Sequence, residues 1–183
     1  MDEFEKIAKQ KEFERFEKVI GAESDPTMRV LRAHLFSENL LERLLIVKLP
    51  RGDKIIENGN LTYHQKLVLI ESLDFIPDSI ISALRNLNKL RNLCAHELNK
   101  TITESDITKI GSPLGKSFTS MKRSAKFDDA VLLGKVIASI CGHLAGACNR
   151  AEHPEAVASE KSTETKRITK RSIGPARKAA QSA

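Results

Sequence analysis

The chain has 183 residues and a formal net charge of +6, a length that suits one domain with a proper core rather than two large ones. Aromatic residues make up only 4% of the chain and Trp is absent, which argues against a β-sandwich or barrel and for a core of aliphatic residues on helices. The three cysteines lie in apolar, helix-like segments, so a reducing compartment is favoured over a disulfide framework; they are Cys94, Cys141 and Cys148.

The sequence has neither the pattern of a signal peptide nor that of a membrane-spanning helix. Its beginning, MDEFEKIAKQKEFERF, is interrupted by charges throughout, whereas a signal peptide needs an apolar run. The most apolar window, 130–148, is broken by Lys135, Ser139 and His143, so it predicts a buried helix rather than the ~18 uncharged residues of a membrane helix. We therefore expect a cytoplasmic protein that does not enter a membrane.

Two amphipathic helices are predicted in the first part of the chain. Residues 3–20 place apolar side chains at roughly helical spacing, so we assign residues 1–24 to an N-terminal amphipathic helix and its end. Asp25 and Pro26 then supply an N-cap and a first-turn proline for a long second helix that continues to Leu49.

A turn-rich connection at 52–61 is expected before the third helix. Thr62 and Gln65 match a capping box, which predicts a short helix to about Leu73. Pro77 opens a fourth helix whose apolar residues recur at steps of three and four: Ile80, Ile81, Leu84, Leu87, Leu90, Cys94 and Leu98.

The remaining body is predicted to be a long connection followed by a last helix. Residues 101–126 are rich in Ser, Thr, Gly and Lys, with one short helix expected after Thr103, and a fifth helix is expected over 128–150. The fold class is therefore all-α, an up-and-down bundle of about five helices within a domain spanning 25–152.

Residues 153–183 are predicted to be a basic, disordered tail because they carry almost no large apolar side chains. Within 160–183, seven Lys and Arg residues face two Glu residues, a local charge of +5 that leaves the folded body nearly neutral. The basic balance of the chain thus makes the tail, rather than the body, a candidate contact for a polyanion.

Two apparent ligand motifs fail on spacing. The segment GSPLGKS at 111–117 has three residues, not four, before its Gly-Lys pair and follows no predicted strand, so we interpret it as a connecting segment and not as a phosphate-binding loop. Cys141, His143 and Cys148 do not have the spacing of zinc ligands. No metal or cofactor is expected, and structural roles are expected for the isolated histidines His34, His64 and His153.

The stretch KLRNLCAHEL, at the end of the fourth predicted helix, places polar residues where an apolar face should be buried. Asn92 and His96 are four apart and share a face, whereas Arg91 and His96 are separated by ~140° around the helix. One interpretation is structural: Arg91 reaches a carboxylate such as Glu38 or Glu97, and Asn92 and His96 satisfy each other.

The other interpretation comes from a family resemblance. RNLCAH, residues 91–96, resembles the signature of the HEPN superfamily (higher eukaryotes and prokaryotes nucleotide-binding), in which an Arg and a polar residue precede a His four to six residues after the Arg. The resemblance covers about 28–114 and includes RAHLFSENLLERLL in the preceding long helix. Leu98 replaces the Tyr of those HEPN toxins in which that Tyr is a modification target. Some members, similar to the mannitol-operon repressor, lack the catalytic pair.

The resemblance implies a homodimer in which Arg91 and His96 of both chains line one cleft. It implies a metal-independent endoribonuclease, the toxin of a toxin–antitoxin or phage-defence system, with Arg91, Asn92 and His96 as catalytic residues. Its partners would be RNA and a cognate antitoxin or regulatory protein. We expect RNA-binding residues in the long connection, at Lys116, Lys122, Arg123 and Lys126. The alternative is a non-catalytic interaction module, antitoxin-like or repressor-like, which the nearly neutral body favours.

Overall fold

A computed structural model describes residues 3–97 and 99–154, and over these residues the protein consists of helices joined by short connections, with no strand. The all-α prediction is therefore confirmed. The predicted number of about five helices is too low, because the described residues form eight α-helices, a π-helical turn and a 3₁₀ turn. The predicted disordered tail lies almost entirely outside the described residues.

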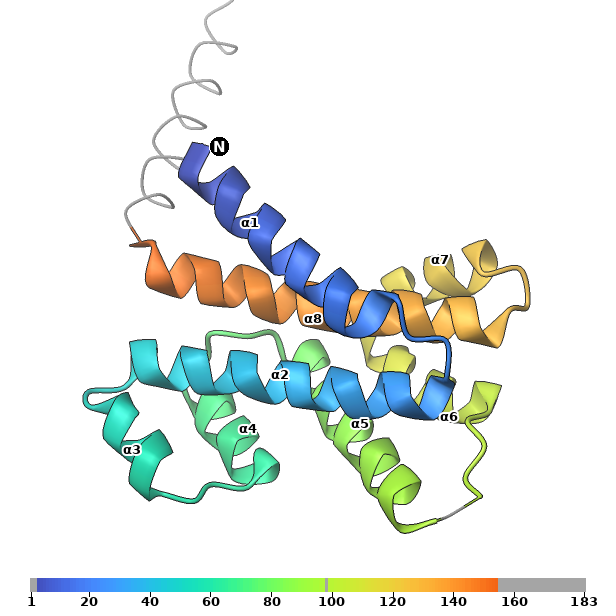
Figure 1. Ribbon diagram of the computed structural model, residues 1–183, viewed down its shortest axis with the longest axis horizontal. Helices are drawn as coiled ribbons and strands as arrows, with labels where there is room; N and C mark the ends of the chain where they lie inside the picture. The colour runs from blue at the N-terminus through green and yellow to red at the C-terminus, as the bar shows by residue number, and fades with distance from the viewer. Residues whose placement is uncertain (1–2, 98, 155–183) are drawn as a thin grey trace, which may run out of the picture.

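Two long helices, α2 (Pro26–Lys48) and α8 (Asp129–Glu152), form the centre of the fold and share its most extensive contact. They run side by side in the same direction (Figure 1). α1 (Glu3–Phe16) lies across the pair and contacts both helices, packing on α8 and reaching α2 through Arg15 with Asn39 and Phe16 with Phe36. The π-helical turn η1 (Glu17–Gly21) ends the first segment. Aspartate N-caps begin both central helices: Asp25 accepts from the Met28 amide, and Asp128 from the Val131 amide.

Shorter helices surround the central pair. α3 (Gly52–Asn58), α4 (Tyr63–Ser72) and α5 (Asp78–His96) pack beside α2, and α4 begins with the predicted capping box of Thr62 and Gln65. The last group, α6 (Glu104–Gly111), η2 (Ser112–Leu114) and α7 (Lys116–Ser124), connects α5 to α8. Five of the predicted apolar residues of α5 are fully buried: Ile80, Ile81, Leu84, Leu87 and Leu90.

The predicted long connection at 101–126 is wrong over most of its length. The short helix after Thr103 is confirmed as α6, but a further helix, α7, follows it. Phe118, Met121 and Ala125 recur at steps of three and four and pack on the core, while the Ser, Thr and Lys residues that suggested a loop occupy the solvent side. The GSPLGKS segment, interpreted as a connecting segment, spans the end of α6, η2 and the start of α7.

The predicted turn-rich connection at 52–61 is also wrong in its first half, where α3 forms. Gly52 is buried against α2, and Ile56 packs on the core from one face of this short helix. Turn-forming residues that remain are Gly59 and Asn60, the latter in the left-handed region with φ of 43°.

Among the described residues, α8 is the one helix long and apolar enough to span a membrane. Half of its most apolar window is buried against the other helices, as in the core helix of a bundle. Helix length and composition alone are thus weak evidence for a membrane segment here.

We predict that Gly52→Ala destabilises the fold, because an added Cβ would lie 2.2 Å from the Leu45 carbonyl oxygen and 2.7 Å from the Ile46 Cα. Backbone cannot yield as a side chain does, so a loss of about 1–3 kcal/mol in the free energy of unfolding is expected from urea denaturation followed by circular dichroism. Gly142→Ala on the exposed face of α8 is the matched control, since nothing lies within 4 Å of its Cβ position. It should stabilise by about 0.5–1 kcal/mol, and equal effects of the two changes would contradict the packing argument.

Candidate functional site

The predicted catalytic residues lie at the surface, on the last two turns of α5. Arg91 is half-buried, whereas Asn92 and His96 are exposed, and α5 ends at His96 where Glu97 becomes extended. The expectation that this segment buries its face is wrong, because α5 extends beyond the core: Leu90 is its last buried residue. The polar side chains therefore do not need buried partners.

Arg91 contacts its neighbour rather than an acid. Its Nη1 donates to the Asn92 Oδ1 at 3.2 Å. Within 3–97 and 99–154, the structure places Arg91 in no ion pair with Glu38 or Glu97 and no hydrogen bond between Asn92 and His96. The contacts that the structural interpretation expected, Arg91 with a carboxylate and Asn92 with His96, are therefore absent from the described residues. Arg91 and His96 both present polar atoms to solvent at one end of one helix.

A buried polar layer lies beside Arg91, between α2, α4 and α5. His34 is only 4% exposed, and its Nε2 donates to the Oδ1 of Asn88, one turn before Arg91 on α5, at 2.9 Å. The imidazole stacks on the Tyr63 ring, with centroids 4.1 Å apart, and the Tyr63 hydroxyl shares a 2.9 Å hydrogen bond with Ser37. This layer fixes the position of α5 against α2 and α4.

The environment of His34 favours its neutral form. Burial lowers its pKa, and the nearby positive charges of Arg91 and Lys66 lower it further, against the opposing effects of the Asn88 hydrogen bond and the Glu38 charge. Because Nε2 donates to Asn88, the neutral ring leaves Nδ1 as an acceptor, and this buried atom has no hydrogen-bond partner within the described residues. Protonation would add a buried donor without an acceptor.

Lys66 closes this layer on the α4 side. Its Nζ donates to Glu38 at 2.7 Å and to Glu42 at 2.6 Å. Burial alone would lower the pKa of Lys66, but the hydrogen bonds to the two carboxylates raise it, so the amine stays charged. Sequence reasoning treated His34 as isolated; its polar contact was not visible because Asn88 lies 54 positions later in the chain.

The four predicted RNA-binding residues lie on α7 and the turn that follows it, and all are exposed: Lys116, Lys122, Arg123 and Lys126. Lys122 forms an ion pair with Glu104 at 2.6 Å. In Figure 1, α7 lies above α8, and the C-terminal end of α5 lies on the opposite side of the bundle, below α2. One chain therefore does not bring these basic residues to Arg91 and His96.

Cys141, His143 and Cys148 do not converge on α8. Both thiols are buried, and burial raises the pKa of each to about 12. His143 is exposed and its Nδ1 lies 2.7 Å from the carbonyl oxygen of Ser139. Over the residues that the structure describes, no three His, Cys, Asp or Glu side chains gather in a way that would hold a metal ion. The histidines His64 and His153 are exposed.

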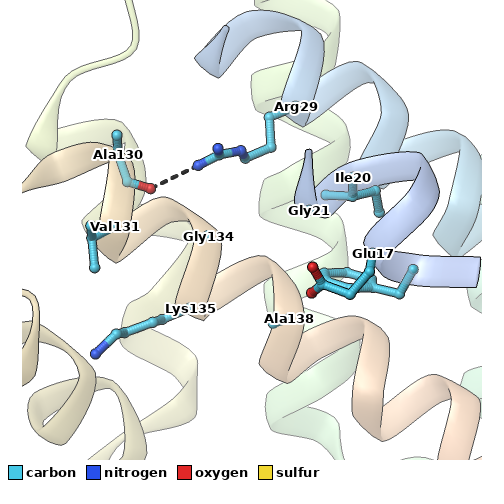
Figure 2. Close-up of a pocket in the computed structure, with 10 residues that line it drawn as sticks. Glu17, Ile20, Gly21, Arg29, Ala130, Val131, Gly134, Lys135 and Ala138 are labelled. Atoms are coloured by element: carbon cyan, nitrogen blue, oxygen red, sulfur yellow. Dashed lines mark hydrogen bonds between the residues drawn. The ribbon is translucent and has the colours of Figure 1, made fainter. Parts of the chain in front are cut away.

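A separate hollow of about 380 Å³ lies where η1 meets the N-terminal halves of α2 and α8 (Figure 2). Arg29 crosses its edge and donates to the Ala130 carbonyl oxygen at 2.9 Å. Gly134 and Ala138 form an apolar floor, with the Glu17 carboxylate at the rim. None of the residues that line it belongs to the sequence-predicted site. Its charged side chains are Glu17, Arg29 and Lys135, and the Arg29 guanidinium is already engaged with the carbonyl oxygens of Glu23 and Ala130.

Comparison with protein-family models, with curated proteins and with solved structures found no match to this chain.

The His34 environment predicts a specific loss of stability in acid. Its pKa in the folded protein lies below the usual 6.5, so the unfolded chain binds a proton more readily. The corresponding stability is fully present above pH 6.5 and declines as the pH falls through 6.5 toward the lowered value, at up to about 1.4 kcal/mol per pH unit. Melting temperatures between pH 7.5 and pH 5 should fall more steeply for the wild type than for His34→Gln, which cannot titrate. Parallel curves would contradict this assignment.

Proposed function

We propose that the protein is a metal-independent endoribonuclease of the HEPN type that acts as a homodimer, in the manner of a toxin of a toxin–antitoxin or phage-defence system, in the cytoplasm. The observation that supports this most is that Arg91 and His96, the two residues of the motif, are both presented to solvent at the end of α5 with no acidic partner among the described residues. Both side chains are therefore free to contact a substrate or a second chain.

The proposed chemistry needs no metal, because RNA carries its own nucleophile in the 2′-hydroxyl. One His96 takes the 2′-hydroxyl proton as the 2′-oxygen attacks phosphorus, and the His96 of the second chain protonates the departing 5′-oxygen. The products are a 2′,3′-cyclic phosphate and a free 5′-hydroxyl. Arg91 binds the non-bridging oxygens of the phosphorane with its planar guanidinium, oriented by its hydrogen bond to Asn92.

A second copy would supply what one chain lacks. Leu93 lies between the motif residues, is 42% exposed, and is three residues from His96, so the two share a face of α5. An exposed apolar side chain beside an arginine and a histidine suits the centre of a protein contact. Pairing of two α5 ends through Leu93 would bring both motifs together and remove the ~140° separation that one helix imposes on Arg91 and His96.

The second candidate is a non-catalytic interaction module, antitoxin-like or similar to the mannitol-operon repressor, that uses the same end of α5 for a protein partner. It is favoured by the separation of α7 from α5: the basic side chains of α7 do not form a groove around the motif within one chain.

The first test is RNA cleavage by purified protein. Arg91→Ala and His96→Ala should each lower the rate by at least about 100-fold, because each removes a group used in the transition state. Cleavage should persist in EDTA and leave 2′,3′-cyclic ends. His64→Ala, at another exposed histidine, is the matched control and should retain full activity. Unchanged cleavage in His96→Ala, or a requirement for a divalent metal, would exclude this mechanism.

The second test is subunit mixing. Because the proposed step uses the His96 of both chains, a heterodimer of a wild-type and a His96→Ala chain keeps only one of the two and should be as inactive as the His96→Ala homodimer. The measurement is the rate of RNA cleavage per wild-type chain after mixing with an excess of His96→Ala chains and re-equilibration, with each protein alone as control. An unchanged rate per wild-type chain, with heterodimers verified by differential tagging, would exclude a shared site.

A further inference from the structure

The turn between α7 and α8 presents an aromatic ring in an unfavourable conformation. Phe127 is 104% exposed, whereas the other exposed large apolar side chains of the described residues range from 42% to 61%. Lys126 and Phe127 both adopt left-handed backbone conformations, with φ of 51° and 68°. Such conformations cost about 1 kcal/mol or more for residues other than glycine, and full exposure of Phe forgoes burial. Neither the left-handed backbone nor the exposed ring stabilises the fold of the isolated chain.

Phe127 belongs to the lining of two hollows. The larger, of about 450 Å³, is otherwise lined by α7 and the turn after it: Phe118, Thr119, Lys122, Arg123 and Lys126. The smaller, of about 80 Å³, is the acidic side of the turn, and the charged residues of its lining are Glu104, Asp128 and Asp129, together with Lys122, which it shares with the larger hollow. Because the larger hollow has three cations and no carboxylate in its lining, an anionic ligand that contacts Phe127 is directed to that side.

The positive charges on that side differ in how far they are neutralised. Lys122 is paired with Glu104, but Arg123 and Lys126 are exposed and enter no ion pair within 3–97 and 99–154. Lys116, also exposed, begins the same helix. Two cations that are unpaired among the described residues and lie in the same hollow as the ring form a surface that suits phosphates and an aromatic base together.

We infer that this turn binds single-stranded RNA, with an unpaired base stacked on Phe127 and its phosphates on Arg123 and Lys126. The inference rests on the proposed function for the identity of the polyanion as RNA. A duplex hides the faces of its bases, so an exposed ring selects unpaired nucleotides, and stacking tolerates any base. A second copy of the chain is the less suitable occupant: its acidic side would have to cover the basic hollow, yet Asp128 is already engaged as the N-cap of α8.

The turn is an anchoring site and not a place of cleavage. Figure 1 shows α7 and the C-terminal end of α5 on opposite sides of the α2–α8 pair. Loss of Phe127 thus weakens RNA binding and raises KM, while the chemical step at Arg91 and His96 continues at saturating RNA.

The experiment measures binding of a fluorescein-labelled, ten-nucleotide oligoadenylate by anisotropy, with the full-length chain carrying His96→Ala so that the probe is not cut. Phe127→Ala should weaken binding by at least about tenfold, and Phe127→Trp should restore it. Phe13→Ala is the matched control, since Phe13 is 58% exposed on α1 and away from this turn, and its affinity should not change. Double-stranded RNA of equal length should compete poorly.

Folding and self-association are checked in the same variants. Phe127→Gly should bind as weakly as Phe127→Ala without a lower melting temperature, because glycine relieves the left-handed strain. Equal RNA affinity of the Phe127→Ala chain and its parent overturns the inference. It is also overturned if sedimentation velocity shows that Phe127→Ala abolishes dimer formation while RNA affinity is unchanged. Phe127-dependent binding by a chain that cleaves no RNA would support the inference and refute the proposed function. A chain that binds no RNA refutes both.

Discussion

The packing of α2 along α8 is the contact on which the other elements depend. Two arginines of α2 secure it at its two ends: Arg29 donates to the Ala130 carbonyl oxygen, and Arg43 forms a bidentate hydrogen bond with Glu152. Arg43 also binds Glu12, so the same side chain holds α1 over the pair. Burial alone would lower the pKa of Arg43, but its hydrogen bonds to the two carboxylates raise it, and the charge persists. An apolar interface has little preference for register, whereas these polar contacts define one.

The other face of α2 uses a polar layer for a similar purpose. His34 binds Asn88 of α5 while Lys66 of α4 binds Glu38 and Glu42 of α2, so three helices are tied to fixed positions by hydrogen bonds. Asn88 is one turn from Arg91, and its bond therefore determines how α5 leaves the core and where the motif emerges. In the proposed dimer the spacing of the two motifs would depend on this layer. His34 is then a positioning residue for the site without touching RNA.

Sequence reasoning succeeded where a helix carries its own signals. The capping box at Thr62, the N-cap at Asp25 and the periodic apolar residues of α5 are local features, and each is present in the structure. It failed at α3 and α7, where Gly, Ser and Lys suggested loops. In the structure Ile56 packs one face of α3 on the core, and Phe118 does the same for α7. The end of α5 was expected to be buried, but whether periodic residues reach the core depends on where the neighbouring helices end. Contacts such as that of His34 with Asn88 join distant positions and cannot be derived from local pattern.

Under the proposed function, the near-neutral charge of the body limits how RNA recognition can be explained. Because the body is nearly neutral, it can neutralise few phosphates at once. Part of the affinity for RNA then has to come from contacts that do not depend on the number of Lys and Arg side chains. The proposed stacking on Phe127 is such a contact, because it releases no counterions from the RNA. The charge of +5 on residues 160–183 would contribute to binding through the release of those counterions. α8 has 24 residues, a length of about 36 Å, so its C-terminal end lies that far from the Phe127 turn. Under the proposed function, base stacking and tail charge are therefore separate contributions, and their different response to salt distinguishes them.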